Sequence, residues 1–319
     1  MSKQKAPAYG GQAVMEGVMF AGKHTYVTAI RRKDDSLEYF EVPKKHRPVL
    51  NSLKKIPLIR GFVAIIEASA NGVKHLNFST DRYDVAPEDD EKVLQENKPS
   101  KLTLILGTAV IGVLSFLLGK FLFTLLPAIA AEAFRPIPIF SGHAGQNIIE
   151  GILKLTLLLS YLYFISMTPL IKRVFQYHGA EHKVINAYEN KLPLTVENVQ
   201  AQSRLHYRCG SSFILFTVII GVFIYLLVPS DPLWLRLISR VALIPVVLGV
   251  SYEVLQGTNK LRNVPILRYL GYPGLWLQLL TTKEPTDKQT EVAIASFNEM
   301  LKRDGEYEKA TAEETIKVV

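Results

Sequence analysis

Four long apolar blocks lie between residues 102 and 255, and each is long enough to cross a membrane as a helix. They cover residues 102–131, 152–171, 210–230 and 237–255. A transmembrane helix needs about 20 consecutive apolar residues. The block at 210–230 carries no charge, whereas Lys120, Lys154, Arg240 and Glu253 interrupt the other three. The pattern predicts a mainly α polytopic membrane protein with about four transmembrane helices.

Basic residues between the blocks predict the topology. The connection at 172–209 contains six of them: Lys172, Arg173, Lys183, Lys191, Arg204 and Arg208. The two outer connections are poor in basic residues, with Arg135 in one and Arg236 near the other. Because cytoplasmic loops carry an excess of Lys and Arg, we expect the 172–209 loop and both termini in the cytoplasm. The expected location is the plasma membrane of a bacterium.

The first hundred residues are soluble in character. Residues 26–30 and 37–42 flank a charged turn and predict a β-hairpin, with a further strand at 13–20. From Pro57 the apolar positions predict an amphipathic helix to about residue 77. This helix is expected either to lie in the membrane interface or to enter it as a re-entrant segment.

The residues after the last block predict an anchor and one more helix. Trp276, within 272–277, is expected at the depth of the lipid headgroups. Thr286 and Gln289 have the spacing of a capping box and predict a helix to about 303, followed by a disordered tail. The expected organisation is a cytoplasmic β-containing region with the interfacial helix (1–80), an acidic linker (81–101), two transmembrane helices (102–171), a cytoplasmic His/Glu/Cys loop (172–209), two more transmembrane helices (210–255) and a cytoplasmic C-terminal helix and tail (256–319).

Composition agrees with a membrane protein. Mean hydropathy is +0.16, above the range usual for soluble proteins, and the net charge of +8 fits basic residues at a lipid surface. No stripe of Arg and Lys interleaves with aromatic residues, so nucleic acid is not an expected partner. The single cysteine, Cys209, excludes an internal disulfide framework. Residues 1–9 lack an apolar segment, so no secretory signal is expected there.

The densest group of chemically capable side chains lies at 177–183. On a helix His178 and His182 are four residues apart, so both imidazoles project from one face and can reach one metal ion. Glu181 lies on the adjoining edge, where it could act as a general base or hold a ligand in place. The order His-x-x-Glu-His is that of inverted zinc peptidases.

The same loop ends with two more metal-ligating residue types, His206 and Cys209. Four ligands would close a structural site, whereas three ligands and a water would make a catalytic one. Zinc or another divalent transition metal is the expected ion. The alternative is that these histidines only form hydrogen bonds and that Cys209 is a small buried apolar residue.

Three acidic residues outside this loop are further candidates. Glu253 lies within the fourth block, where a charge in hydrocarbon is costly and is therefore a functional candidate, as general base or further ligand. It could instead reach the interface, or the block could end at Tyr252. Glu16 and Glu67 are set among apolar neighbours. The glycine-rich stretch at 10–17 lacks the spacing of a phosphate-binding or dinucleotide-binding loop.

Several motifs together carry a family resemblance over nearly the whole chain. They are 10–19 (GGQAVMEGVM), Arg60-Gly61 leading into Glu67, 177–183 (YHGAEHK), 194–199 (LTVENV), 206–213 (HYRCGSSF), 251–253 (SYE) and 273–278 (PGLWLQ). In these motifs the sequence resembles the YqhQ-like family of bacterial multi-pass membrane proteins, which are predicted metal-dependent enzymes. The resemblance implies a bacterial plasma-membrane setting.

The function expected from these features is that of a metal-dependent hydrolase at the cytoplasmic face, acting on a membrane-associated substrate. Glu181 or Glu253 would activate water at a metal held by His178, His182 and either His206 or Cys209. One alternative is a non-enzymatic assembly or chaperone-like protein with a structural metal site. The other is a transport or lipid-handling protein. The lipid bilayer is the expected partner, together with other membrane proteins.

Overall fold

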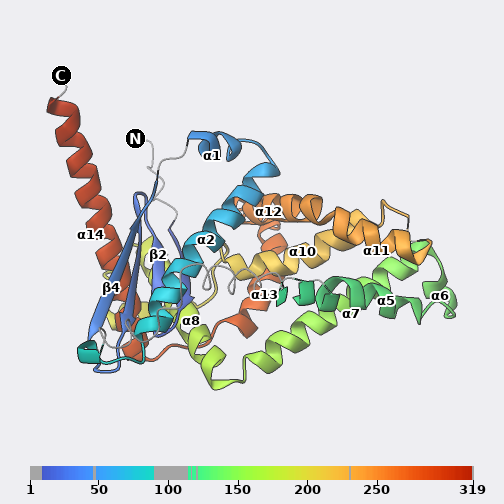
Figure 1. The fold of residues 1–319 in the computed structure, drawn as a ribbon, viewed down its shortest axis with the longest axis horizontal. Coiled ribbons are helices and arrows are strands. Elements are labelled where there is room, and N and C mark those ends of the chain that lie inside the picture. Colours follow the sequence, from blue (N-terminus) through green and yellow to red (C-terminus); the bar gives the residue numbers. More distant parts are fainter. Residues whose placement is uncertain are drawn as a thin grey trace.

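The protein combines a small antiparallel sheet with a larger helical part. The computed structural model describes residues 9–45, 48–89, 114–115, 117–119, 121–229 and 231–317, and in 311–317 only the backbone is described. Figure 1 shows the sheet and the C-terminal helix at one end of the molecule and an elongated group of helices at the other.

The sheet is an antiparallel meander whose strands follow one another in sequence order. Its strands are β1 (Gly10–Val14), β2 (Gly17–Ala21), β3 (Thr25–Arg31) and β4 (Leu37–Pro43). The predicted hairpin is confirmed, with Tyr26 opposite Val42 and Arg31 opposite Leu37. The single strand predicted at 13–20 is wrong. Glu16 adopts a left-handed conformation (φ 52°), which reverses the chain between β1 and β2.

Two helices share the core of the sheet. Helix α14 (Asp287–Lys317) packs against β2 and β3, and helix α8 (Pro169–Glu189) packs against α14 and β1. Fully buried side chains from all three meet there, among them Phe20, Val184 and Phe297. The predicted helix from 286 is confirmed, but it continues to Lys317, so the tail expected to be disordered from residue 304 is helical over most of its length.

The connection at 172–209 is largely helical rather than a loop. Most of it belongs to α8, and a short helix, α9 (Val196–Gln200), follows. Gly179 does not break α8 but allows close packing: a Cβ there would lie 2.1 Å from the carbonyl oxygen of Lys283. The chain can therefore place His178 and His182 on one continuous helix.

Between the sheet and the helical part runs α2 (Ile59–Arg82), the helix predicted from Pro57. It follows the short α1 (Pro48–Leu53) and contacts both β1 and α12 (Ile244–Lys260). Buried Gly61 and Gly72 let the neighbouring elements approach α2 closely. A 3-10 turn, η1 (Pro87–Asp89), follows α2, and the rest of the predicted acidic linker, 90–101, lies outside the described residues.

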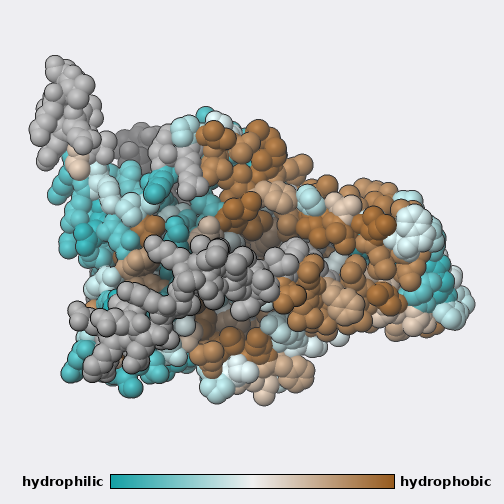
Figure 2. Space-filling model, viewed as in Figure 1, coloured by the Kyte–Doolittle hydropathy of each residue, from teal (hydrophilic) through white to brown (hydrophobic). Residues whose placement is uncertain are grey.

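The remaining helices form what we call the helical body. They are η2 (Phe121–Leu125), α5 (Leu126–Glu132), α6 (Pro138–Ser141), α7 (His143–Ile165), α10 (Gly210–Tyr225), α11 (Leu233–Ala242), α12, η3 (Leu267–Gly271) and α13 (Tyr272–Thr281). Figure 2 shows hydrophobic side chains over most of this body, whereas the sheet end is hydrophilic. At the end of the body furthest from the sheet, around α6, the surface is hydrophilic again, and we call this part the hydrophilic cap.

Within the described residues, one helix is long and apolar enough to cross a membrane, or two if a bent pair counts as one span. The first is α7, which ends at Ile165 because Pro169 disfavours helical geometry before it. The bent pair is α11 and α12, which meet at 52°. Helix α10 is apolar but only 16 residues long, and nearly half of the predicted first span, 102–113 with 116 and 120, lies outside the described residues. The structure therefore shows a mainly helical protein with one or two candidate spans.

Candidate metal centre

Three potential metal ligands from two helices meet in one place. His178 and His182 project from one face of α8, and Cys209 directly precedes α10. One ligand atom of each lies within 4.8 Å of the other two. Tetrahedral zinc, with bonds of about 2.0–2.3 Å, would hold its ligand atoms about 3.3–3.8 Å apart. The group is therefore close to the size of a zinc site.

Backbone carbonyl groups orient both imidazoles. Nδ1 of His178 lies 2.7 Å from the carbonyl oxygen of Thr281, and Nδ1 of His182 lies 2.6 Å from that of Arg204. A carbonyl oxygen only accepts, so each Nδ1 carries a proton, and Nε2 is the ring nitrogen left to face the other ligands. Nε2 of His178 lies 3.2 Å from Sγ of Cys209. Metal-binding histidines are held in the same way, with the second ring nitrogen donating to a carbonyl or carboxylate.

The electrostatics of the group favour a thiolate. Burial acts to raise the pKa of the Cys209 thiol, but the charges and hydrogen bonds of His178 and His182 lower it well below its usual value. Burial acts to lower the pKa of His178, and the Cys209 charge with its hydrogen bond raises it to about 9. Thiolate is the form of cysteine that binds metal, so the two histidines prepare Cys209 for that role.

Glu181 lies beside the three ligands, on the side facing β1. Its side chain is 5% exposed and touches the backbone of Gly11. Burial raises the pKa of Glu181, while His178, His182 and the backbone N–H of Gly11 act to lower it. The carboxyl group is not one of the three clustered ligands, but its position suits a group that takes up or gives back a proton close to them.

A larger residue would not fit at the position of Gly11, because Glu181 and β2 occupy the space beside it. A Cβ at this position would lie 2.6 Å from the carbonyl oxygen of Met19 and 3.0 Å from Cδ of Glu181. We expect Gly11→Ala to destabilise the protein by about 1–3 kcal/mol, because the β1 backbone must shift. Gly10→Ala is the matched control, since a Cβ there meets nothing within 4 Å. Thermal melting of both variants in detergent checks this, and equal melting temperatures would contradict it.

A cavity lies on the other side of Gly11. It has a volume of about 440 Å³ and is lined by residues of β1, β2, β3, α2 and α12 and by Lys54, which follows α1. Gln12, Asn71, Lys54 and Glu67 contribute polar groups to its wall. Gly11 lines this wall and also lies beside Glu181, so the cavity and the carboxyl group share one neighbour.

His206 lies near the three ligands without joining them. Its ring centroid is 5.8 Å from that of His182, and its Nε2 is 3.7 Å from a carboxylate oxygen of Glu189. The backbone around it is fixed by Gln278, whose Oε1 accepts from the N–H of His206 while its Nε2 donates to the carbonyl oxygen. His206 therefore does not complete a set of four ligands.

The acidic candidates from other parts of the chain lie elsewhere and have other partners. Glu253 forms an ion pair with Arg60 and accepts a hydrogen bond from the backbone N–H of Leu58. Glu253 is therefore not one of the three clustered ligands: α12 packs on α2, and the carboxylate joins these two helices.

Glu16 and Glu67 are also engaged in ion pairs away from the three ligands. Glu16 pairs with Arg173 and accepts a hydrogen bond from the hydroxyl of Tyr177 at 3.1 Å. Glu67 pairs with Lys54 at 2.5 Å in the wall of the cavity. Each of these ion pairs joins two separate segments of the chain, which indicates a structural role.

The groups that orient the imidazoles leave no mark in the sequence. Thr281 and Arg204 act through backbone carbonyls, which every residue has, so no residue type marks them. The glycine-rich stretch at 10–17 was compared only with phosphate-binding and dinucleotide-binding loops, although the position of Gly11 beside β2 and Glu181 explains why a glycine is needed. The sequence did contain a signal for Gly11, because two glycines stand together next to a strand.

Comparisons with known proteins agree on one family. The model of the family described as "Protein of unknown function (DUF1385)" matches residues 56–303. The protein YqhQ of Bacillus subtilis (strain 168) is 69% identical over 304 residues, which cover 95% of each chain. The chain belongs to the YqhQ-like family. The resemblance drawn from the sequence motifs is thereby confirmed. No solved structure matches the chain.

Proposed function

We propose that this YqhQ-like protein is a membrane-associated, metal-dependent hydrolase whose metal ligands are His178, His182 and Cys209. The observation that carries the proposal is the pair of carbonyl-held imidazoles directed at one thiol. Zinc accepts imidazole and thiolate together, and three protein ligands leave a fourth position for water, as in catalytic sites. A zinc ion there would supply Lewis acidity and make water acidic enough to lose a proton near neutral pH.

In this proposal Glu181 acts as the general base and general acid. It lies against the ligand group, it is shielded from solvent, and it packs beside Gly11, which lines the neighbouring cavity. It would take a proton from water and return it to the leaving group. The cavity would hold the substrate, because amide groups of Gln12 and Asn71 line it together with the Lys54–Glu67 ion pair.

The proposed substrate is associated with the membrane, and the proposed site faces the cytoplasm. The apolar helical body places the cavity wall formed by α2 and α12 next to candidate membrane spans. The segment that carries His178 and His182 is rich in basic residues, which supports the cytoplasmic side. A peptide near the membrane surface or a lipid headgroup would meet these requirements.

Metal analysis combined with one substitution tests the proposal. We expect the purified wild-type protein to carry about one equivalent of zinc per chain. Glu181→Gln should keep the metal but slow hydrolysis about 10²–10⁴-fold, as loss of a general base does. Hydrolysis would be measured on a panel of peptides, carboxylic esters and phosphoesters in lipid vesicles. A protein without bound transition metal, unchanged by chelation, would overturn the proposal.

A structural metal site is the second candidate. It is favoured by the way the ligands join α8 to the start of α10, so that a metal would fasten the sheet end to the helical body. Such a site would lower the melting temperature when the metal is removed, while no substrate of the panel would be turned over and Glu181→Gln would change nothing.

A further inference from the structure

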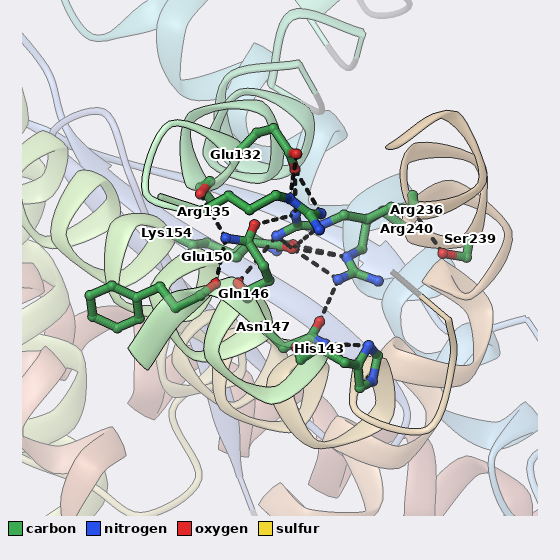
Figure 3. A network of polar contacts seen from close by, with 12 residues as sticks. Glu132, Arg135, His143, Gln146, Asn147, Glu150, Lys154, Arg236, Ser239 and Arg240 are labelled. Carbon is green, nitrogen blue, oxygen red and sulfur yellow. Dashed lines mark hydrogen bonds and ion pairs between the residues drawn. The ribbon is translucent and has the colours of Figure 1, made fainter. Parts of the chain in front are cut away.

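A buried group of charges lies in the helical body, far from the candidate metal centre in the fold. Arg236 and Arg240 of α11 are both fully buried, and both donate to the carboxylate of Glu150 on α7 (Figure 3). The distances from Glu150 oxygens to guanidinium nitrogens are 2.9–3.2 Å. The group lies towards the end of the body where α6 and the hydrophilic cap are found.

Positive charge exceeds negative charge in this group. Among the described residues its ion pairs join four cations to three carboxylates: Arg135, Lys154, Arg236 and Arg240 with Glu132, Glu150 and Asp231. Nη1 of Arg240 is buried and has no hydrogen-bond partner within the part of the chain that the structure describes. A buried guanidinium nitrogen without a partner is costly, and an anion nearby would relieve that cost.

A largely apolar cavity adjoins the charged group. Its volume is about 410 Å³, and Lys154 and Tyr225 line its end nearest Glu150. The guanidinium carbon of Arg240 lies 4.1 Å from the centre of the Tyr225 ring, and Nζ of Lys154 lies 5.4 Å from the same ring. Lys154 also reaches Glu150 at 3.7 Å. One end of the cavity is thus polar and carries the excess positive charge.

The rest of the cavity is hydrophobic and elongated along α7. Its wall is built by Leu158 and Leu162 of α7, Phe123 of η2, and Ile214 and Val218 of α10. Lys154 and Leu162 are eight residues apart on α7, so the wall extends about 12 Å along the helix axis. The cavity therefore has a cationic end and an apolar channel that lines about half the length of a long acyl chain.

We propose that this cavity binds a fatty acid, with its carboxylate at Lys154 and its chain along α7. The volume falls in the lower part of the range of about 300–1,000 Å³ found for small-ligand sites, and one acyl chain fits this better than the two of a phospholipid. The carboxylate neutralises the excess positive charge, and the apolar walls enclose the chain. This site is independent of the proposed metal chemistry.

Binding of matched single-chain probes tests the proposal. Purified protein in a neutral maltoside detergent is titrated with radiolabelled palmitate and, separately, with palmityl alcohol of the same chain length. We expect saturable binding of palmitate at least about 10-fold tighter than binding of the alcohol, which has no charge for Lys154. Equal affinity for the two probes would show adventitious filling of an apolar space and overturn the proposal.

Three variants identify the site. Lys154→Met keeps the length of the side chain but removes its charge, and it should reduce the preference for palmitate. Val218→Trp should fill the cavity and abolish binding, whereas Phe223→Trp on the same helix is the matched control, because Phe223 is 62% exposed. Undiminished binding to Val218→Trp, or equal competition by dioleoylphosphatidylglycerol, would contradict the assignment. If Lys154→Met fails to fold, the comparison of the two probes on the wild-type protein decides.

Discussion

Replacing His182 with alanine is expected to release the metal from this protein. The substitution removes one of the three ligands that cluster among the described residues, and because the position is buried, a water molecule cannot easily take the place of the imidazole. It also leaves the carbonyl oxygen of Arg204 without its donor, so the segment before α10 loses a contact that holds Cys209 in place. We expect the affinity for zinc to fall by more than about 100-fold, since even loss of an orienting partner costs 10–100-fold.

His206→Ala is the matched control for this prediction. His206 is a buried histidine next to His182, but its Nε2 faces Glu189 instead of Cys209. We expect this variant to keep its zinc. Elemental analysis of both variants beside the wild type, with thermal melting to confirm folding, measures the difference. Loss of zinc from His206→Ala together with retention by His182→Ala would place the site elsewhere.

Removing the charge of Glu150 is expected to cause the largest loss of stability. The two arginines that Glu150 holds are fully buried, and within the described residues the only other carboxylate paired with either is Glu132, 3.6 Å from Arg236. Glu150→Gln would therefore leave two guanidinium charges poorly compensated inside the helical body. Breaking a buried pair by removing one partner costs about 3–5 kcal/mol.

Glu132→Gln serves as the control for this substitution. Glu132 also pairs with arginines, closely with Arg135 and at 3.6 Å with Arg236, but its side chain is 35% exposed. Water can take over the lost contact, so we expect a change of no more than about 1 kcal/mol. Melting temperature and yield of folded protein after extraction into detergent measure both effects. Equal losses in the two variants would mean that Glu150 does not hold the arginines as its contacts indicate.

Local patterns in the sequence were enough to predict several elements. The hairpin of β3 and β4 and the helix α2 were found because alternation of apolar residues and their helical spacing depend on neighbours in the chain. Errors occurred where one residue changed the geometry. Glu16 divides a predicted strand in two, and Pro169 ends a predicted span early. The count of transmembrane helices remains a prediction, because one or two described helices meet the criteria for a span.

The sequence by itself determined that His178 and His182 share one face of a helix, because a spacing of four residues does this on any α-helix. Only the tertiary structure decided which other groups approach them. Cys209 approaches the two imidazoles. Glu253 does not join them, because the packing of α12 on α2 places its carboxylate in an ion pair with Arg60. Contacts between segments distant in the chain depend on how whole elements pack, and no local pattern of residues encodes that packing.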